Sequence, residues 1–378
     1  MVVRVLASLV CLMLCAPASL CQSSKVENQL QQLQQAAEQA LDRGDSAAAI
    51  AIAQRGLKLR HNWKEGLWTL GWALFQTKQY GPARDTFVNL VRLDESKGAS
   101  WLLLGLCEFQ ARDYGMALDD LLRGRSLGIP TSLGITSQVR YSTAVALLLS
   151  QRYDRAVQFF EEAAHEKEHT DAILLAWGLA AMRMPVEPQH AQDLFTPPEL
   201  AMLHSIGEAM FRAASHELKD TDNIYNDLFR QYPSTIKLHD SYGFLLLRLG
   251  NIGEAEPQFR AELEVDPNSV LARLGLGYVA LEQDRANDAI KLGREATELE
   301  PGSSSTHLLL GKALLAESEK NEAVAELELA RDLDPANMLV HFLLARAYGS
   351  VKRNSDAEHE RSEFLRLKQM NDVPALPR

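Results

Sequence analysis

The stretch 239–267, HDSYGFLLLRLGNIGEAEPQFRAELEVDP, decides the fold of this 378-residue chain. Two more stretches follow it in the same register: RLGLGYVALEQDRANDAIKLGREATELEP at 273–301 and HLLLGKALLAESEKNEAVAELELARDLDP at 307–335. Each contains a helical apolar pattern, a turn rich in Gly, Asn or Asp, and a second helical pattern that stops at proline. Self-similarity at a fixed spacing is typical of repeat architectures.

Small residues mark the period of this pattern. Gly243, Gly277 and Gly311 are 34 apart, and so are Gly71 and Gly105 in the other half of the chain. An alanine follows each glycine by twelve positions: Ala255, Ala289, Ala323, Ala83 and Ala117. Small side chains allow two helices to approach closely, and Pro267, Pro301 and Pro335 close three of these units. Because one helix pair cannot bury its own apolar face, such units must stack on one another.

These residues resemble the tetratricopeptide repeat, a pair of antiparallel helices. The family pattern has Trp or Leu, then Leu-Gly, Tyr, Ala, Phe or Tyr, Ala and Pro at fixed offsets. The resemblance implies an all-α fold, a right-handed superhelical solenoid of antiparallel helix pairs. In this register the units fall at 30–63, 64–97, 98–131, 137–170, 171–201, 202–235, 236–269, 270–303, 304–337 and 338–371.

Interruptions of the register predict the organisation of the chain. The run MPVEPQHAQDLFTPPEL holds four prolines and is expected to separate two sub-arrays. A local loop in a continuous solenoid is the alternative, and the sequence leaves both open. The expected segments are a signal peptide at 1–21, a short linker at 22–29, an N-terminal sub-array at 30–184, a Pro-rich break at 185–198, a C-terminal sub-array at 199–371 and a tail at 372–378.

The N-terminus has the pattern of a secretory signal. Arg4 precedes an apolar run from Val5 to Cys15, and the small-residue sequence Ala-Pro-Ala follows. Cleavage after Ala18 or after Cys21 fits this pattern. A lipid anchor at Cys21 fits less well, because Leu20 occupies a position that prefers a small residue. An uncleaved anchor is a further alternative. We therefore expect an extracytoplasmic protein, periplasmic or secreted, without an integral membrane span in the mature chain.

Composition limits the functional classes. The net charge is -11, which argues against a general nucleic-acid binder because phosphate binding favours a basic surface. Cleavage after Cys21 would remove Arg4, leave 38 basic against 50 acidic residues, and leave Cys107 as the last cysteine. An intramolecular disulfide would then be impossible, and Cys107 is expected to be a buried apolar thiol.

The pentapeptide HEKEH at 165–169 matches the H-E-x-x-H signature of zinc peptidases. On one helix, that spacing places two imidazoles on a shared face, with Glu166 available as a general base. In the repeat register, however, the helix is expected to end between His165 and His169. The sequence contains no G-x-S-x-G, no Walker phosphate loop and no C-x-x-C. We predict no catalytic residues, no metal and no cofactor, with a zinc-dependent peptidase as the enzymatic alternative.

The resemblance also implies a concave groove, lined by the first helices of successive repeats, that binds peptides or extended protein segments. The expected function is an exported, non-enzymatic scaffold for protein or peptide partners; a lipid-anchored component of an envelope assembly complex is another alternative. The Lys, Arg and Asn pattern with which peptide-chaperone clamps of this family hold a terminal carboxylate is absent. The residues at the groove offsets are Trp68, Trp72, Phe75, Leu102, Leu106, Phe109, Tyr141, Phe244, Tyr278 and Arg346.

The first part of this set would form an aromatic and aliphatic strip, and strips of that size indicate a partner. The alternative is that the chain itself covers the strip. The segment before residue 30, the loop at 185–198 or a tight superhelix could provide that cover.

Overall fold

The computed structural model describes residues 16–371, with side chains described for 25–368. Every regular element in this range is helical, which confirms the all-α prediction. None of the helices in this range combines the length and the apolar character needed to span a membrane. Residues 1–15, which hold most of the predicted signal peptide, and the predicted tail at 372–378 lie outside the described range.

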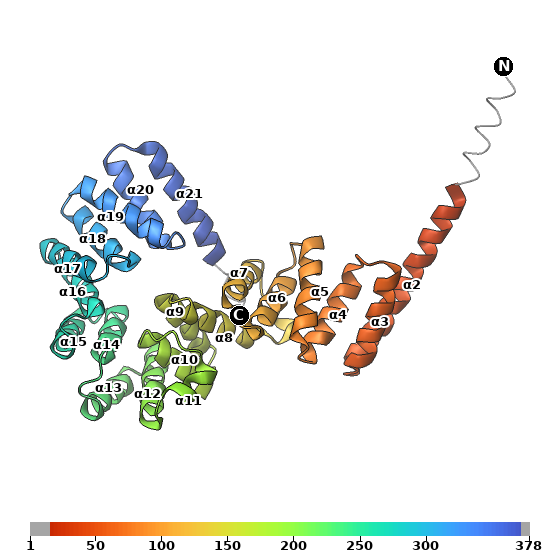
Figure 1. The fold of residues 1–378 in the computed structure, drawn as a ribbon, viewed down its shortest axis with the longest axis horizontal. Coiled ribbons are helices and arrows are strands. Elements are labelled where there is room, and N and C mark those ends of the chain that lie inside the picture. Colours follow the sequence, from red (N-terminus) through yellow and green to blue (C-terminus); the bar gives the residue numbers. More distant parts are fainter. Residues whose placement is uncertain (1–15, 372–378) are drawn as a thin grey trace, which may run out of the picture. The chain divides into compact units, whose positions relative to one another are not determined.

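Contacts divide the chain into two compact units, Met1–Val139 and Arg140–Arg378 (Figure 1). The division falls after Val139 and not in the Pro-rich stretch at 185–198, which lies inside the second unit. Residues 22–29, expected as a linker, continue the helix α2. The helices of the first unit are α2 (Ala16–Asp42), α3 (Ser46–Leu59), α4 (Lys64–Gln76), α5 (Tyr80–Leu93), α6 (Gly98–Gln110), α7 (Tyr114–Ser126) and the 3-10 helix η1 (Thr131–Leu133).

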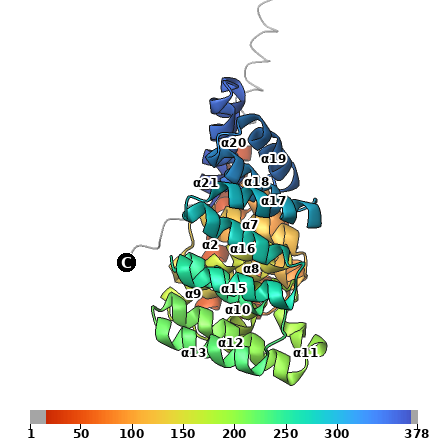
Figure 2. The ribbon, with the colours of Figure 1, turned by 90° about the vertical axis from the view of Figure 1, so that its left-hand side faces the viewer.

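Helix α8 (Thr136–Leu149) crosses the division, and the remaining helices belong to the second unit. Figure 2 shows the pairs of this unit following one another from α12 and α13 toward α20 and α21. These helices are α9 (Tyr153–His165), α10 (Asp171–Ala181), η2 (Pro188–His190), α11 (Ala191–Leu194), α12 (Pro197–Ala214), α13 (Leu218–Gln231), α14 (Leu238–Arg248), α15 (Ile252–Val265), α16 (Val270–Glu282), α17 (Ala286–Leu299), α18 (Ser304–Ala316), α19 (Lys320–Leu333), α20 (Met338–Ser350) and α21 (Asn354–Asn371).

The periodic glycines lie where neighbouring helices approach each other, within a pair or between consecutive pairs. At Gly243 of α14, an added Cβ would lie 2.7 Å from the ring of Phe259, which belongs to α15 and is fully buried. At Gly311 of α18, it would lie 2.6 Å from Leu327 of α19. Such distances leave no room for a methyl group, so the glycine sets how deeply the larger side chain enters the pair.

The turns inside the pairs repeat the same backbone geometry. Gly250, Asp284, Ser318 and Lys352 follow one another at the spacing of the repeat, and all have positive φ. A left-handed residue after a helix stops it and redirects the chain, and glycine adopts this conformation without strain. Three of these four turns use another residue, so the stacked pairs must hold the backbone in this conformation.

The Pro-rich stretch does not separate the helices on its two sides. It contains η2 and α11, and Pro197 then begins α12 with Thr196 and Glu199 forming a capping box. Helices α10 and α12 are in close contact. Gly178 of α10 lies against the backbone of Leu203, and Gly207 of α12 lies against the backbone of Leu174. Within the second unit, 185–198 is therefore a loop that joins two closely packed helices.

Candidate partner-binding surfaces

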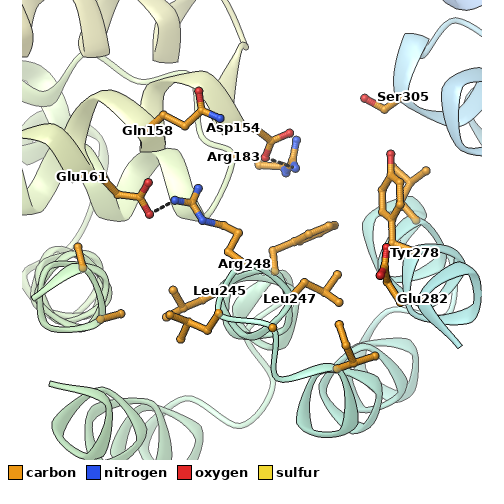
Figure 3. A pocket seen from close by; sticks show the side chains of 17 residues that line it. Asp154, Gln158, Glu161, Arg183, Leu245, Leu247, Arg248, Tyr278, Glu282 and Ser305 are labelled. Carbon is orange, nitrogen blue, oxygen red and sulfur yellow. Dashed lines mark hydrogen bonds and ion pairs between the residues drawn. The ribbon is translucent and has the colours of Figure 1, made fainter. Parts of the chain in front are cut away.

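The second unit contains a cavity of about 780 Å³ (Figure 3). Its wall comes from α9, the turn after α10, the end of α12, α14, the start of α15, α16 and the start of α18. Helices α14, α16 and α18 are the first helices of three consecutive repeats. The cavity thus lies on the face that the repeat register assigns to the groove.

Two aromatic residues of the predicted groove lie together in this cavity. Phe244 of α14 and Tyr278 of α16 both line it and are one repeat apart in the sequence. The Phe244 ring stands edge-on to Phe259 with their centroids 5.0 Å apart, which fixes its orientation. Burial raises the pKa of Tyr278 to about 12, so its hydroxyl stays protonated at neutral pH. The ammonium of Lys312 lies 5.5 Å from the Tyr278 ring centroid.

Arg183 brings a positive charge to the same wall. It is in the turn after α10, where its φ is 51°, and a guanidinium nitrogen donates to Oδ1 of Asp154 at 2.9 Å. The guanidinium carbon lies 5.2 Å from the centroid of Phe244 and 5.6 Å from that of Tyr153. The Arg183 side chain is 19% exposed, whereas the Asp154 side chain is 77% exposed. Two aromatic rings therefore hold the cation, while its carboxylate partner is largely in solvent.

A second arginine–carboxylate pair lies farther along the cavity. Arg248, the last residue of α14, donates to Glu161 of α9, and both side chains are about one-third exposed. Burial lowers the pKa of Arg248, although the charge of Asp154 opposes this shift. Asp154 and Glu161 are seven positions apart on α9 and share one helix face. Figure 3 shows both pairs bordering the cavity.

In the first unit, α4 carries the stacked rings of Trp68, Trp72 and Phe75. The planes of Trp68 and Trp72 differ by 1° with centroids 6.5 Å apart, and those of Trp72 and Phe75 differ by 16° at 6.0 Å. Both tryptophans are partly exposed, whereas Phe75 is buried. The exposed part of the strip therefore consists mainly of two tryptophan rings.

The expected continuation of this strip onto α6 is wrong for Leu102 and Leu106. Both are fully buried, so neither presents a surface to a partner. Helix α6 packs between α5 and α7, and Gly124 of α7 leaves the space that Leu102 fills: a Cβ there would lie 2.7 Å from Cγ of Leu102. Phe109 remains partly exposed and stands edge-on to Tyr114, with centroids 5.4 Å apart.

The other predicted groove residues, Tyr141 and Arg346, do not line the cavity. Tyr141 of α8 is partly buried, and burial raises its pKa to about 12. Arg346 of α20 is exposed and lies 6.0 Å above the ring of Phe342, which is 43% exposed. The buried thiol predicted at Cys107 is confirmed; burial raises its pKa to about 12.

The HEKEH segment straddles a helix end, as the register predicted. Helix α9 ends at His165, and Lys167 has a φ of 59°. His169 lies beyond this turn, where its Nε2 is 2.6 Å from Oε2 of Glu208 and its ring stands edge-on to Phe211. The two imidazoles therefore do not share a helix face. No group of three or more His, Cys, Asp or Glu residues placed to hold a metal occurs in the part of the chain that the structure describes.

The sequence reasoning missed the two arginine–carboxylate pairs of the cavity, Arg183 with Asp154 and Arg248 with Glu161. Arg248 carried a usable signal, because it follows Phe244 by four positions and so lies on the same helix face. Asp154 and Glu161 are on a second helix, which the register does not assign to the groove. Arg183 is in a turn, and no sequence pattern marks it. Only the fold brings these residues together.

Comparisons with known proteins agree with the repeat. A family model described as tetratricopeptide repeat matches residues 69–126 and 245–304, and no curated protein matches the chain. Solved structures with similarity include residues 41 to the end of MamA from Desulfovibrio magneticus, with 18% identity, a TM-score of 0.40, and coverage of 47% of this chain and 98% of that one. Yeast Tom70 has 12% identity and a TM-score of 0.39, with coverage of 91% and 87%.

The two matched segments lie one in each unit, and both fall on the periodic helix pairs described above. The chain therefore contains tetratricopeptide repeats in both units.

Proposed function

We propose that this protein is an exported, non-enzymatic scaffold that binds a partner protein in the cavity of its second unit. The observation that carries the proposal is the pair Phe244 and Tyr278, which occupy the same position of consecutive repeats and open together into a cavity bordered by Arg183 and Arg248. Phe, Tyr and Arg are enriched at the centres of protein interfaces. Consecutive repeats offer their side chains in a row, which suits an extended segment.

The stacked Trp68 and Trp72 of the first unit belong to the same proposal as a second contact surface. Tryptophan supplies a large apolar area at low conformational cost, and partly exposed tryptophans are frequent binding hot spots. Trp72→Ala should reduce recovery of any partner that uses this surface. Equal recovery by the wild type and Trp72→Ala would restrict the proposal to the second unit.

Site-specific photo-crosslinking tests the cavity directly. A photoreactive amino acid at position 278 should capture a specific protein from extracytoplasmic extract, and Phe244→Ala in the same chain should abolish the capture. The control places the same group at Leu299, which is 41% exposed at the end of the second helix α17. Identical products from positions 278 and 299, or products insensitive to Phe244→Ala, would refute cavity binding.

The proposal of export rests on the apolar run Val5–Cys15 and the Ala-Pro-Ala sequence that follows it. Mass spectrometry of the protein from its native source should show a mature chain beginning after Ala18 or Cys21. A lipid on Cys21 would support the anchored alternative. A chain that still begins at Met1 would count against export by cleavage.

A further inference from the structure

We infer that the cavity of the second unit recognises an extended acidic segment, in which an apolar side chain is followed by Asp or Glu residues. This inference rests on the proposed function and adds the chemistry of the partner. It depends on three features: an apolar floor, two arginines whose present partners are accessible carboxylates, and a change from aromatic to cationic residues along the repeats.

The floor of the cavity accepts an apolar side chain. Phe244, Leu274 and Tyr278 line it from α14 and α16, and Ile252 lines it from the start of α15. Leu274 is 5% exposed and Phe244 is held edge-on against Phe259. The floor is therefore formed before a partner binds, so little ordering cost opposes its use.

Arg183 is placed to bind a carboxylate from the partner. The rings of Tyr153 and Phe244 hold its guanidinium, which is planar and can bind a carboxylate through two parallel hydrogen bonds. Its present partner, Asp154, is 77% exposed and can turn away into solvent without losing buried contacts. An incoming carboxylate would then replace Asp154 while the arginine stays in position.

Arg248 provides a second binding point of the same kind. It is paired with Glu161, both side chains are about one-third exposed, and burial lowers the pKa of Arg248. An added negative charge from a partner would offset this desolvation. The cavity wall also holds the carboxylates of Asp154 and Glu161, each paired with one of these arginines. Glu282 is the remaining acidic residue of the lining.

The first helices of the last four repeats give the site a direction. At one position of these consecutive repeats, the chain has Phe244, Tyr278, Lys312 and Arg346. Lys312 lies over the ring of Tyr278, and Arg346 lies over the ring of Phe342. The residue at this position is thus aromatic on α14 and α16 and cationic on α18 and α20. We place the apolar side chain of the segment over α14 and α16, and its acidic residues toward α18 and α20.

Fluorescence anisotropy of the full-length chain with labelled peptides tests this assignment. One probe carries Phe-Leu followed by a run of Asp and Glu, the second replaces the acidic run by Lys and Arg, and the third replaces Phe-Leu by Ser-Ser. We expect the first peptide to bind at least about tenfold more tightly than either of the others, since like charges facing each other and lost apolar contacts both weaken a complex. Its affinity should fall as salt is raised.

Three variants test whether the cavity charges determine binding of the acidic peptide. Arg183→Gln combined with Arg248→Gln should weaken the acidic peptide by about tenfold or more. Asp154→Ala removes the internal competitor at a solvent-exposed side chain and should strengthen binding of the acidic peptide a few-fold. Arg123→Gln is the matched control, because Arg123 also lies over a ring, 4.0 Å from Trp101, and pairs with Glu95, but in the first unit. It should leave binding unchanged.

The inference is overturned if the basic peptide binds more tightly, if no peptide binds, or if Asp154→Ala fails to strengthen the acidic peptide. Circular dichroism and thermal melting verify that each variant is folded. Photo-crosslinking at position 278 tests the proposed function independently of the peptide measurements. Capture of a protein there without acidic preference would leave the proposed function standing and refute the acidic assignment alone.

Discussion

Replacing Glu108 by Gln should remove a pH dependence from the stability of the first unit. Glu108 is on α6 and only 4% exposed, and its Oε2 has no hydrogen-bond partner. Burial, followed by the charge of Asp120 on α7, raises the pKa of Glu108 from 4.5 to about 8, and burial also raises the pKa of Asp120. Asp113 contributes in the same direction, and Arg84 opposes it. Near neutral pH, the folded protein therefore holds a proton in this pair that the unfolded chain releases.

The sign follows from proton linkage. Because the folded-state pKa is raised, the folded state binds more protons than the unfolded state between pH 4.5 and about 8, so stability falls as pH rises through this window. A difference of one bound proton between the folded and unfolded states changes the free energy of unfolding by about 1.4 kcal/mol per pH unit. Between pH 6.5 and 8, the wild type should lose up to about 2 kcal/mol from this pair, and the loss should level off above the folded-state pKa.

Urea unfolding followed by tryptophan fluorescence measures this loss. Trp63, Trp68, Trp72 and Trp101 are all in the first unit, so the signal reports mainly on the unit that contains Glu108. Glu108→Gln keeps an amide that can donate to Asp120 but has no proton to release. Between pH 6.5 and 8, the unfolding free energy of Glu108→Gln should therefore fall by up to about 2 kcal/mol less than that of the wild type.

The control is Glu38→Gln, since Glu38 is an exposed residue of the same unit. Its unfolding free energy should follow the wild-type pH dependence. If Glu108→Gln instead keeps the wild-type slope between pH 6.5 and 9, the reasoning about a shared buried proton is refuted.

Three further predictions concern the second unit. Asp240 is 1% exposed and burial raises its pKa from 3.8 to about 7, so the wild type loses stability as the pH rises toward 7. Asp240→Asn should therefore raise the free energy of unfolding by about 2 to 3 kcal/mol more at pH 8 than at pH 5, as measured by urea unfolding. Glu262 accepts the backbone N–H groups of Lys237, His239 and Asp240 at the start of α14, so Glu262→Ala should lower the melting temperature through a loss of about 2 kcal/mol or more, and an unchanged melting temperature would contradict this role. Gly178→Ala would push a methyl group against the Leu203 carbonyl and should cost about 2 kcal/mol or more, whereas Gly115→Ala, with no atom near the added Cβ, should be neutral or stabilising in the same melt.

The local fold was predictable because the sequence of each repeat contains the pattern of its two helices and the turn between them. Gly243, Gly277 and Gly311 marked the close approaches, and the turns after them marked the helix ends. The role of the 185–198 stretch was not predictable in this way. Its prolines favour a break, but Gly178 and Gly207 bring α10 and α12 into backbone contact, and nothing in the local sequence relates two glycines on helices separated by a loop.

The aromatic part of the cavity was predictable from the register, and the charged part was not. Phe244 and Tyr278 repeat at the period of the fold, so their common face follows from the sequence. Arg183 reaches the cavity from a turn, and Asp154 and Glu161 reach it from the second helix of another repeat. Their positions depend on how consecutive repeats pack, which the pattern within one repeat does not contain.

Repeat offset alone does not decide whether a groove residue reaches a partner; the size of its side chain decides as well. Two groove offsets are compared: three positions before the periodic glycine and one position after it. At these offsets the aliphatic residues Leu102, Leu106 and Leu274 are buried, whereas the rings of Trp68, Trp72, Phe244 and Tyr278 are partly exposed. A leucine is short enough to be covered by neighbouring helices, while a ring extends beyond them and keeps one part in solvent. Leu106→Trp would test this: a partly exposed ring with a fluorescence maximum red-shifted relative to a buried tryptophan supports the size argument. A fully buried emission would show that the packing around α6, and not the length of the side chain, closes the strip.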